Sequence, residues 1–147
     1  MPQANNNGAI RGIEPILPRP EVALKDMRYA PGIRITPDMD LVYFSGMTAY
    51  PMEVDPWNPG SFRLPESVDE QNRMLTDNID RMLKAAGITW QHIVLMVRHT
   101  VENPSRDFMA EKFGDWRPCT TSLWVSETGV PGAKVLYEIT AAVPRGA

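Results

Sequence analysis

The chain has 147 residues, of which 15 are basic and 18 acidic, so its formal net charge is −3. This length suits one domain with a single hydrophobic core. The sequence has no run of lysines and arginines, which argues against a protein that binds nucleic acid through clustered positive charge. Its single cysteine, Cys119, cannot form a disulfide within the chain and favours a reducing compartment.

Two kinds of targeting segment are also disfavoured. The opening residues, MPQANNNGAIRGIEP, lack the charged start and apolar stretch of a signal peptide. No run approaches the roughly 20 apolar residues that a membrane helix needs. We therefore expect a cytoplasmic protein with no membrane and no nucleic acid among its partners.

The N-terminal segment, residues 1–20, is rich in asparagine and proline. Pro15, Pro18 and Pro20 predict an extended arm without regular structure, ahead of a single domain over residues 21–147. A first strand region is predicted within 21–35, with a turn at 30–32. The arm is expected to order only where it docks on a neighbour.

The next segments contain one strand and one long loop. The continuous apolar run LVYF at 41–44 predicts a strand covered on both faces, closed by Ser45 and Gly46. Residues 51–66 are rich in proline and predict a long loop, in which Trp57 and Phe62 favour packing over disorder.

The clearest helix is expected between Ser67 and Gly87. Ser67 and Glu70 form a capping box, apolar residues follow at helical spacing, and Gly87 supplies a C-terminal stop. A third strand is predicted within 88–101. A short helix is then expected from Asn103 and Pro104 through Phe113, because a capping residue precedes a proline there.

The segment 116–143 predicts a pair of strands joined by a loop rich in glycine and proline. Period-two alternation predicts that Thr120 and Ser122 share a face with Glu138. A lone carboxylate in such an apolar strand is costly to bury without a partner or a task. The whole order of elements predicts an α+β fold, with helices packed on one face of a sheet.

Several residues have both a chemical and a structural interpretation. His92 and His99 lack acidic or cysteine ligands at suitable spacing, so surface or packing roles are favoured over a metal site. Cys119 suits a buried small hydrophobe better than a nucleophile. Ser45 has no visible base, and Glu138 fits either catalysis or an ion pair with an arginine. No nucleotide-binding motif and no hydrolase elbow occurs.

A set of short motifs resembles the YjgF/RidA (reactive intermediate deaminase) family over residues 21–144. The motifs are LVYFSG, Gln71, Asn78, Ala85-Ala86-Gly87, Asp107-Phe108, Arg117-Pro118 and Glu138-Ile139. The resemblance implies a chorismate-mutase-like α+β fold, with a mixed sheet and two helices on one face. It also implies a homotrimer whose sheets enclose a barrel, with ligand clefts at the subunit interfaces. Members of the family hydrolyse enamines and imines such as 2-aminoacrylate without metal or cofactor, whereas others only bind small molecules.

The resemblance assigns roles to particular residues of this chain. The cleft tyrosine falls on Tyr29, the strand-end serine and glycine on Ser45 and Gly46, and the water-positioning carboxylate on Glu138. A small cleft residue falls on Ser122.

The family's substrate-gripping arginine falls on Thr120, which is neutral and cannot make a two-pronged contact with a carboxylate. Arg106 is the expected replacement cation, whereas Arg117, at a turn, is disfavoured. We therefore expect a cofactor-free hydrolase or deaminase that acts on a small C–N metabolite other than 2-aminoacrylate. The alternative is a trimer that binds a small molecule without chemistry. A ribonuclease, the family's older description, fits the negative net charge badly.

Overall fold

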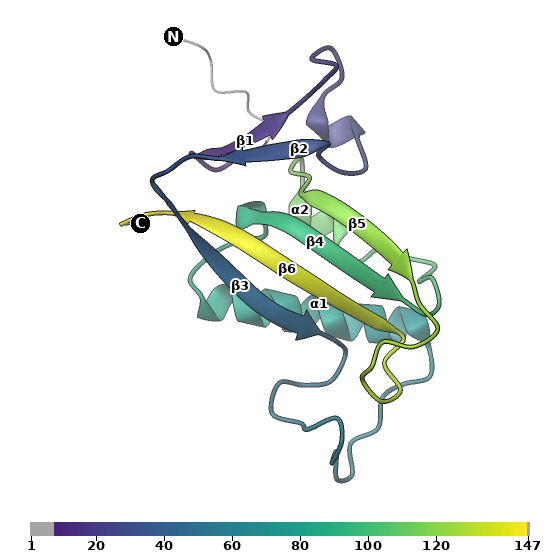
Figure 1. Cartoon of the computed structure of the whole chain (residues 1–147). Coiled ribbons are helices and arrows are strands. Elements are labelled where there is room, and N and C mark those ends of the chain that lie inside the picture. The colour runs from purple at the N-terminus through teal and green to yellow at the C-terminus, as the bar shows by residue number, and fades with distance from the viewer. Residues whose placement is uncertain (1–7, 147) are drawn as a thin grey trace.

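The computed structural model describes residues 8–146 and contains two sheets (Figure 1). Strands β1 (Ile13–Ile16) and β2 (Gly32–Ile35) form an antiparallel pair. The main sheet has the order β3-β6-β4-β5, in which β6 is antiparallel to both β3 and β4, and β5 is parallel to β4. Its strands are β3 (Met39–Met47), β4 (Ile93–Thr100), β5 (Cys119–Trp124) and β6 (Val135–Pro144).

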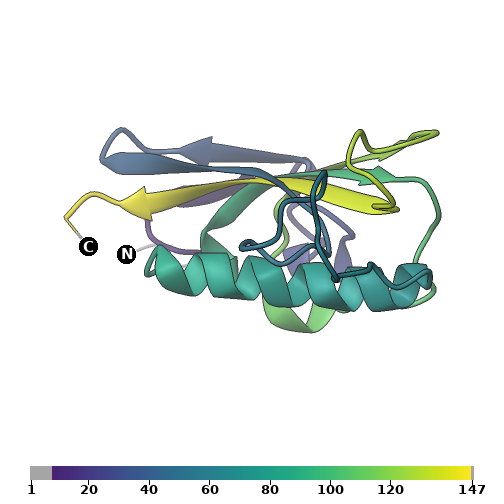
Figure 2. The same ribbon diagram turned by 90° about the horizontal axis from the view of Figure 1, so that it is seen from below.

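The helices α1 (Val68–Ala85) and α2 (Ala110–Phe113) lie on the same side of the main sheet (Figure 2). Two short 3-10 turns, η1 (Leu24–Asp26) and η2 (Trp90–His92), precede β2 and β4. Among the described residues, no helix covers the opposite side of the main sheet, which we call the open face (Figure 2). The predicted α+β class, with a mixed sheet and two helices on one face, is confirmed.

Helix α1 forms where its local signals predicted it. The Ser67 hydroxyl accepts a hydrogen bond from the backbone N–H of Glu70, and Gly87 ends the helix with a φ of 71°. Leu75, Ile79 and Leu83 are buried against the sheet, so the apolar stripe is core. Within the described residues, no helix is long and apolar enough to cross a membrane.

Two buried amides of α1 fasten the loops around the sheet. The Gln71 side chain donates to the carbonyls of Pro65 and Gly132 and accepts from the Lys134 N–H. Asn78 Nδ2 donates to the carbonyls of Thr48 and Tyr50, each at 2.9 Å. Because buried backbone groups need partners, these amides fix the ends of β3 and β6.

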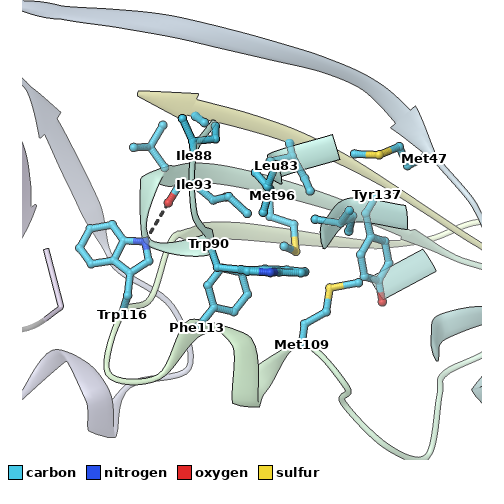
Figure 3. Close-up of a cluster of buried hydrophobic side chains, with 14 of the residues drawn as sticks. Met47, Leu83, Ile88, Trp90, Ile93, Met96, Met109, Phe113, Trp116 and Tyr137 are labelled. Atoms are coloured by element: carbon cyan, nitrogen blue, oxygen red, sulfur yellow. Dashed lines mark hydrogen bonds between the residues drawn. The ribbon is translucent and has the colours of Figure 1, made fainter. Parts of the chain in front are cut away.

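The core between sheet and helices is rich in large side chains (Figure 3). Trp116 is fully buried and donates from Nε1 to the Ile93 carbonyl at 2.8 Å. Trp90 packs edge-on against Phe113, with ring centroids 5.2 Å apart. These contacts position α2 against the start of β4.

One prediction for the N-terminal part of the chain was wrong. The arm at 1–20 contains β1, where Pro15 pairs with Ile33 on an edge strand that tolerates a missing N–H. Ile13 of this strand is buried in the chain's own core. The strand region predicted within 21–35 is present as β2, and it is preceded by η1. The domain boundary at residue 20 stays a prediction.

The predicted pairing of the last two strands was also wrong. Strand β4 lies between β5 and β6, so the two strands are not neighbours. The loop 125–134 carries the chain across β4, which a tight hairpin could not do.

The second helix is shorter than predicted and begins at Ala110. Asp69 accepts hydrogen bonds from the Ser105 N–H and hydroxyl, and Asp107 accepts one from the Met109 N–H. The long-range bonds from Ser105 to Asp69 and the local bond from Met109 to Asp107 hold the backbone after Pro104 in a non-helical path.

Candidate functional site

The main sheet separates the predicted site residues into two groups. Val97 of β4 pairs with Glu138 on one side and with Thr121 on the other, so these three side chains share the open face. Met96 pairs with Thr120, and Arg98 pairs with Ser122, on the face that carries the helices. The prediction that Glu138 shares a face with Thr120 and Ser122 is therefore wrong for a single chain, because inserting β4 changes the register.

Glu138 lies on the open face opposite an irregularity in β3. Phe44 pairs with Ile139 and Met47 with Tyr137, so Ser45 and Gly46 together lie opposite Glu138. Among the described residues, no side chain forms an ion pair or hydrogen bond with the Glu138 carboxylate, which is exposed in the single chain. The alternative that Glu138 serves an ion pair with an arginine receives no support from these contacts.

Gly46 approaches β6 so closely that a larger residue would collide with it. A Cβ built there would lie 2.7 Å from Cδ2 of Leu136. Gly46 also lines a hollow of about 250 Å³ whose other wall is the loop that follows β3, including Trp57. The predicted loop 51–66 is packed, since Phe62 contacts the Tyr50 ring at a centroid distance of 5.6 Å. Trp57, however, remains largely exposed.

A second cavity, of about 420 Å³, lies on the helix side and includes Thr120. Its apolar wall consists of Met27, Met96, Met109 and Phe113. Figure 3 shows Met96, Met109 and Phe113 gathered in the layer between α2 and the sheet. We call this space the methionine cavity; its size and mixed lining are typical of small-molecule sites.

The charged lining of the methionine cavity is mostly basic. Three arginines, Arg28, Arg98 and Arg117, face one carboxylate, Asp107. This balance contrasts with the net charge of −3 for the whole chain. A lining with excess positive charge favours an anionic ligand.

Arg117 is already occupied by the protein itself. Its guanidinium donates to the backbone carbonyls of Lys25, Met27, Gly114 and Trp116. These bonds connect η1 to the start of β5, so Arg117 has a structural role. This agrees with the prediction that Arg117 does not replace the missing arginine.

Arg98 is held differently. Its Nη2 donates to the Tyr137 hydroxyl at 3.1 Å, and its guanidinium carbon lies 5.0 Å from the centre of the same ring. Within residues 8–146, Arg98 has no other side-chain hydrogen bond and no carboxylate within ion-pair distance. Arg98 therefore brings a half-buried and unneutralised charge to the cavity.

The remaining predicted residues lie around this region. Tyr29 is about half exposed, and its neighbour Ala30 donates its N–H to the Pro118 carbonyl just before Thr120. Arg106 is exposed, stacks on Phe108 at 4.7 Å and lies 3.9 Å from Glu111. Arg106 does not line the methionine cavity.

A catalytic or metal-binding role was disfavoured for Cys119, His92 and His99. The contacts of these three residues suit structural roles instead. Burial raises the pKa of the Cys119 thiol, which lowers its reactivity. His92 Nδ1 accepts from the Thr89 N–H at the start of η2, and burial lowers the pKa of this imidazole. His99 lies on the open face between Leu136 and Leu123, and its buried Nδ1 has no partner in the described chain. The described residues contain no cluster of side chains suited to a metal ion.

No protein-family model and no curated protein sequence matches the chain. Two structures of the conserved Rid protein family from Yersinia pestis are similar. The protein YyfB is 14% identical, with a TM-score of 0.69, over 90% of this chain and 99% of its own. The protein YyfA is 27% identical, with a TM-score of 0.58, over 78% of this chain and 87% of its own.

The chain has the fold of the Rid/YjgF family. A Mycobacterium tuberculosis protein of the YjgF/YER057c/UK114 family has the same fold, with 23% identity and a TM-score of 0.51 over 78% of this chain and 86% of its own. Both Yersinia proteins are described as having unknown function, so the likeness gives the fold and leaves the reaction open.

Sequence reasoning missed Arg98. The segment IVLMVRHT is apolar except at its end, and an arginine two residues before its final threonine resembles a strand end reaching solvent. The sequence did contain one signal for Arg98. Period-two alternation along the strand places Arg98 on the same face as Met96. Only the parallel pairing with β5 shows that this face also holds Thr120 and Ser122.

Proposed function

We propose that this protein is a hydrolase or deaminase that acts on a small enamine, imine or activated C–N metabolite other than 2-aminoacrylate. The observation that carries the proposal is the unpaired Glu138 carboxylate opposite Ser45 and Gly46 on the open face. A carboxylate without a cation keeps its capacity to accept a proton from water, which is the task of a general base. Family resemblance further suggests that the reaction needs neither a metal nor a cofactor.

The proposed site takes its residues from two subunits of a homotrimer. In one chain, Glu138 and Thr120 occupy opposite faces of the sheet, so no single cleft contains both. A cleft between subunits removes this difficulty, because one subunit supplies Glu138, Ser45 and Gly46 while the next supplies Thr120 and Ser122. Tyr29 and Arg106 would then lie near the second group.

The exposed apolar side chains of the open face support such an assembly. Leu41, Tyr43, Leu95 and Leu123 are each more than a third exposed, and all four belong to this face. A patch of this kind on a sheet is typical of an interaction surface. The prediction that the strand at 41–44 is covered on both faces therefore needs a second subunit.

A complementation assay tests the reaction and the shared site together. Imines would be generated with an amino-acid oxidase, and their hydrolysis would be followed as ammonia release by the wild type. We expect Glu138→Gln and Ser122→Tyr each to lose turnover. Unfolding and refolding the two variants together should restore about a quarter of the wild-type sites by random assortment.

The outcomes separate the parts of the proposal. Turnover by the refolded mixture that exceeds the mean turnover of the two pure variants supports a site shared between subunits. A Glu138→Gln variant as active as the wild type would remove the role of Glu138. An inactive mixture with stable mixed trimers would mean that each site lies within one chain.

A trimer that binds a ligand without chemistry is the second candidate. The observation in its favour is that Thr120 is neutral at the position where the family's deaminases hold their substrate. On this alternative, no imine or amide would turn over, and Glu138→Gln would bind ligands as the wild type does. A ribonuclease is disfavoured by the net negative charge.

A further inference from the structure

The methionine cavity contains a positive charge that the protein does not neutralise. Arg98 projects from β4 on the helix face, and its pairing with Ser122 lies one row beyond the pairing of Met96 with Thr120. Two residues along a strand span roughly 7 Å. The cation of this chain is therefore displaced along the sheet from Thr120, and it lies on a neighbouring strand.

Contact with Tyr137 fixes the orientation of the Arg98 side chain. The Tyr137 side chain is fully buried, and its hydroxyl accepts both from Arg98 Nη2 and from Asn72 Nδ2 at 3.3 Å. A guanidinium has five N–H donors, so this single bond leaves donors free to face the cavity. A cation held in one orientation loses little entropy when it binds a ligand.

We propose that Arg98 anchors the carboxylate of a small monocarboxylate whose apolar tail lies against Met27, Met96 and Met109. The proposal deepens the proposed function, because Thr120 belongs to this cavity, and it names the anionic group of the ligand. A planar carboxylate matches the fork of a guanidinium. The methionines provide adaptable apolar surface for a flexible tail.

The other charged groups around the cavity further restrict the charge that the ligand can carry. Arg117 has its donors committed to four carbonyls, and Arg28 is exposed at the cavity wall. Asp107 is the one carboxylate in the lining, and it would repel a doubly charged group such as a phosphate. A single negative charge therefore suits this lining better than two. A cavity of about 420 Å³ also exceeds what a three-carbon acid would fill.

Binding can be measured without any turnover. The protein would be labelled with [methyl-¹³C]methionine and titrated with pentanoate, with the uncharged isostere pentanamide, and with inorganic phosphate. We expect the methyl signals of Met27, Met96 and Met109 to shift and saturate with pentanoate. The signal of Met52, which lies outside this cavity, should not move. Pentanamide should bind at least about tenfold more weakly, because it lacks the charge.

Variants assign the charge to one side chain. Arg98→Gln should weaken pentanoate binding by about 10- to 100-fold and remove the preference over pentanamide. Arg98→Lys keeps the charge but not the fork, so an intermediate loss is expected. Arg73→Gln changes an exposed arginine of α1 and should bind as the wild type does.

Each outcome decides the proposal. Equal binding of pentanoate and pentanamide by the wild type would overturn it without any variant, and so would unchanged affinity in a folded Arg98→Gln protein. Tighter binding of phosphate than of pentanoate would also overturn it. Because the titration uses no reaction, pentanoate binding in a protein without turnover would leave this inference standing while the proposed hydrolysis fails.

Discussion

The guanidinium of Arg98 stacks on the ring of Tyr137 and also donates to its hydroxyl, so one buried tyrosine contacts the cation through both its ring and its hydroxyl. The same hydroxyl accepts from Asn72 of α1. This chain of contacts links the helix, the central strands and the methionine cavity. The orientation of Arg98 is therefore determined by the core rather than by solvent.

Removing the Tyr137 hydroxyl should destabilise the fold. In Tyr137→Phe, the buried Asn72 amide loses its partner, and its Oδ1 already has none in the described chain. Leaving a buried polar group unsatisfied costs about 1–3 kcal/mol, so urea unfolding should show a loss of that size. Tyr43→Phe, at an exposed tyrosine, is the control and should leave the unfolding free energy unchanged. Equal stability of both variants would contradict this network.

The close approach at Gly46 makes a second prediction. In Gly46→Ala, the added Cβ would lie 2.7 Å from Leu136 Cδ2, so the leucine must move beside Glu138. Overpacking of this kind costs about 1–3 kcal/mol, and we expect a loss near the lower end because a side-chain tip can rotate. The measurement is a double-mutant cycle by chemical unfolding.

The matched partner in that cycle is Leu136→Ala. If the collision is the cause, Gly46→Ala should cost almost nothing in the Leu136→Ala background. An additive double variant would mean that Gly46 is needed for backbone reasons instead. Turnover should fall in Gly46→Ala and recover in the double variant if Leu136 displaces ligand or water near Glu138.

The accuracy of sequence-based prediction differs between local and non-local features. Helix α1 was predicted because Ser67, the apolar stripe and Gly87 act within a few residues of one another. The faces of Thr120 and Glu138 were not, because they depend on β4 inserting between two strands that follow it in the chain. Alternation gives the two faces of one strand, but only the pairing shows which faces of different strands coincide.

The candidate site shows the same division. Family motifs identified Ser45, Gly46 and Glu138, which the structure brings together around the β3 irregularity. Arg98 was missed, since its importance comes from Tyr137, a residue 39 positions away along the chain. Strand β1 was missed because a proline at an edge costs no ladder hydrogen bond.

The apolar side chains of the open face should control assembly. We expect Tyr43→Glu to dissociate the proposed trimer, because it places a charge on a face that a second subunit would cover. Ile16→Glu changes another exposed hydrophobic residue, which lies on β1 outside the main sheet, and should leave assembly intact. Sedimentation velocity of the wild type and both variants measures this. A wild type that sediments as a monomer would contradict the shared site directly.

The stability of the chain should fall in acid partly through Asp80. Lys84 donates to this carboxylate at 2.8 Å, and Trp90 Nε1 donates to it at 3.0 Å. These contacts, first that of the lysine and then that of the indole, hold the pKa of Asp80 below its usual value. Because the folded-state pKa is lower than the unfolded one, the stabilisation is fully present above about pH 4. It is lost as the pH falls through the folded-state pKa.

Asp80→Asn should therefore destabilise the protein at neutral pH and much less in strong acid. We expect a loss of about 1 kcal/mol at pH 7, since the indole keeps an acceptor while the contact with Lys84 is lost. Urea unfolding of the wild type and the variant at pH 7 and pH 3 gives the difference, which cancels the titration of all other groups. Asp77→Asn, in an exposed pair with Arg73, should show a smaller loss at pH 7. A difference for Asp80→Asn that stays constant between the two pH values would mean that packing of the side chain, rather than its charge, stabilises this end of α1.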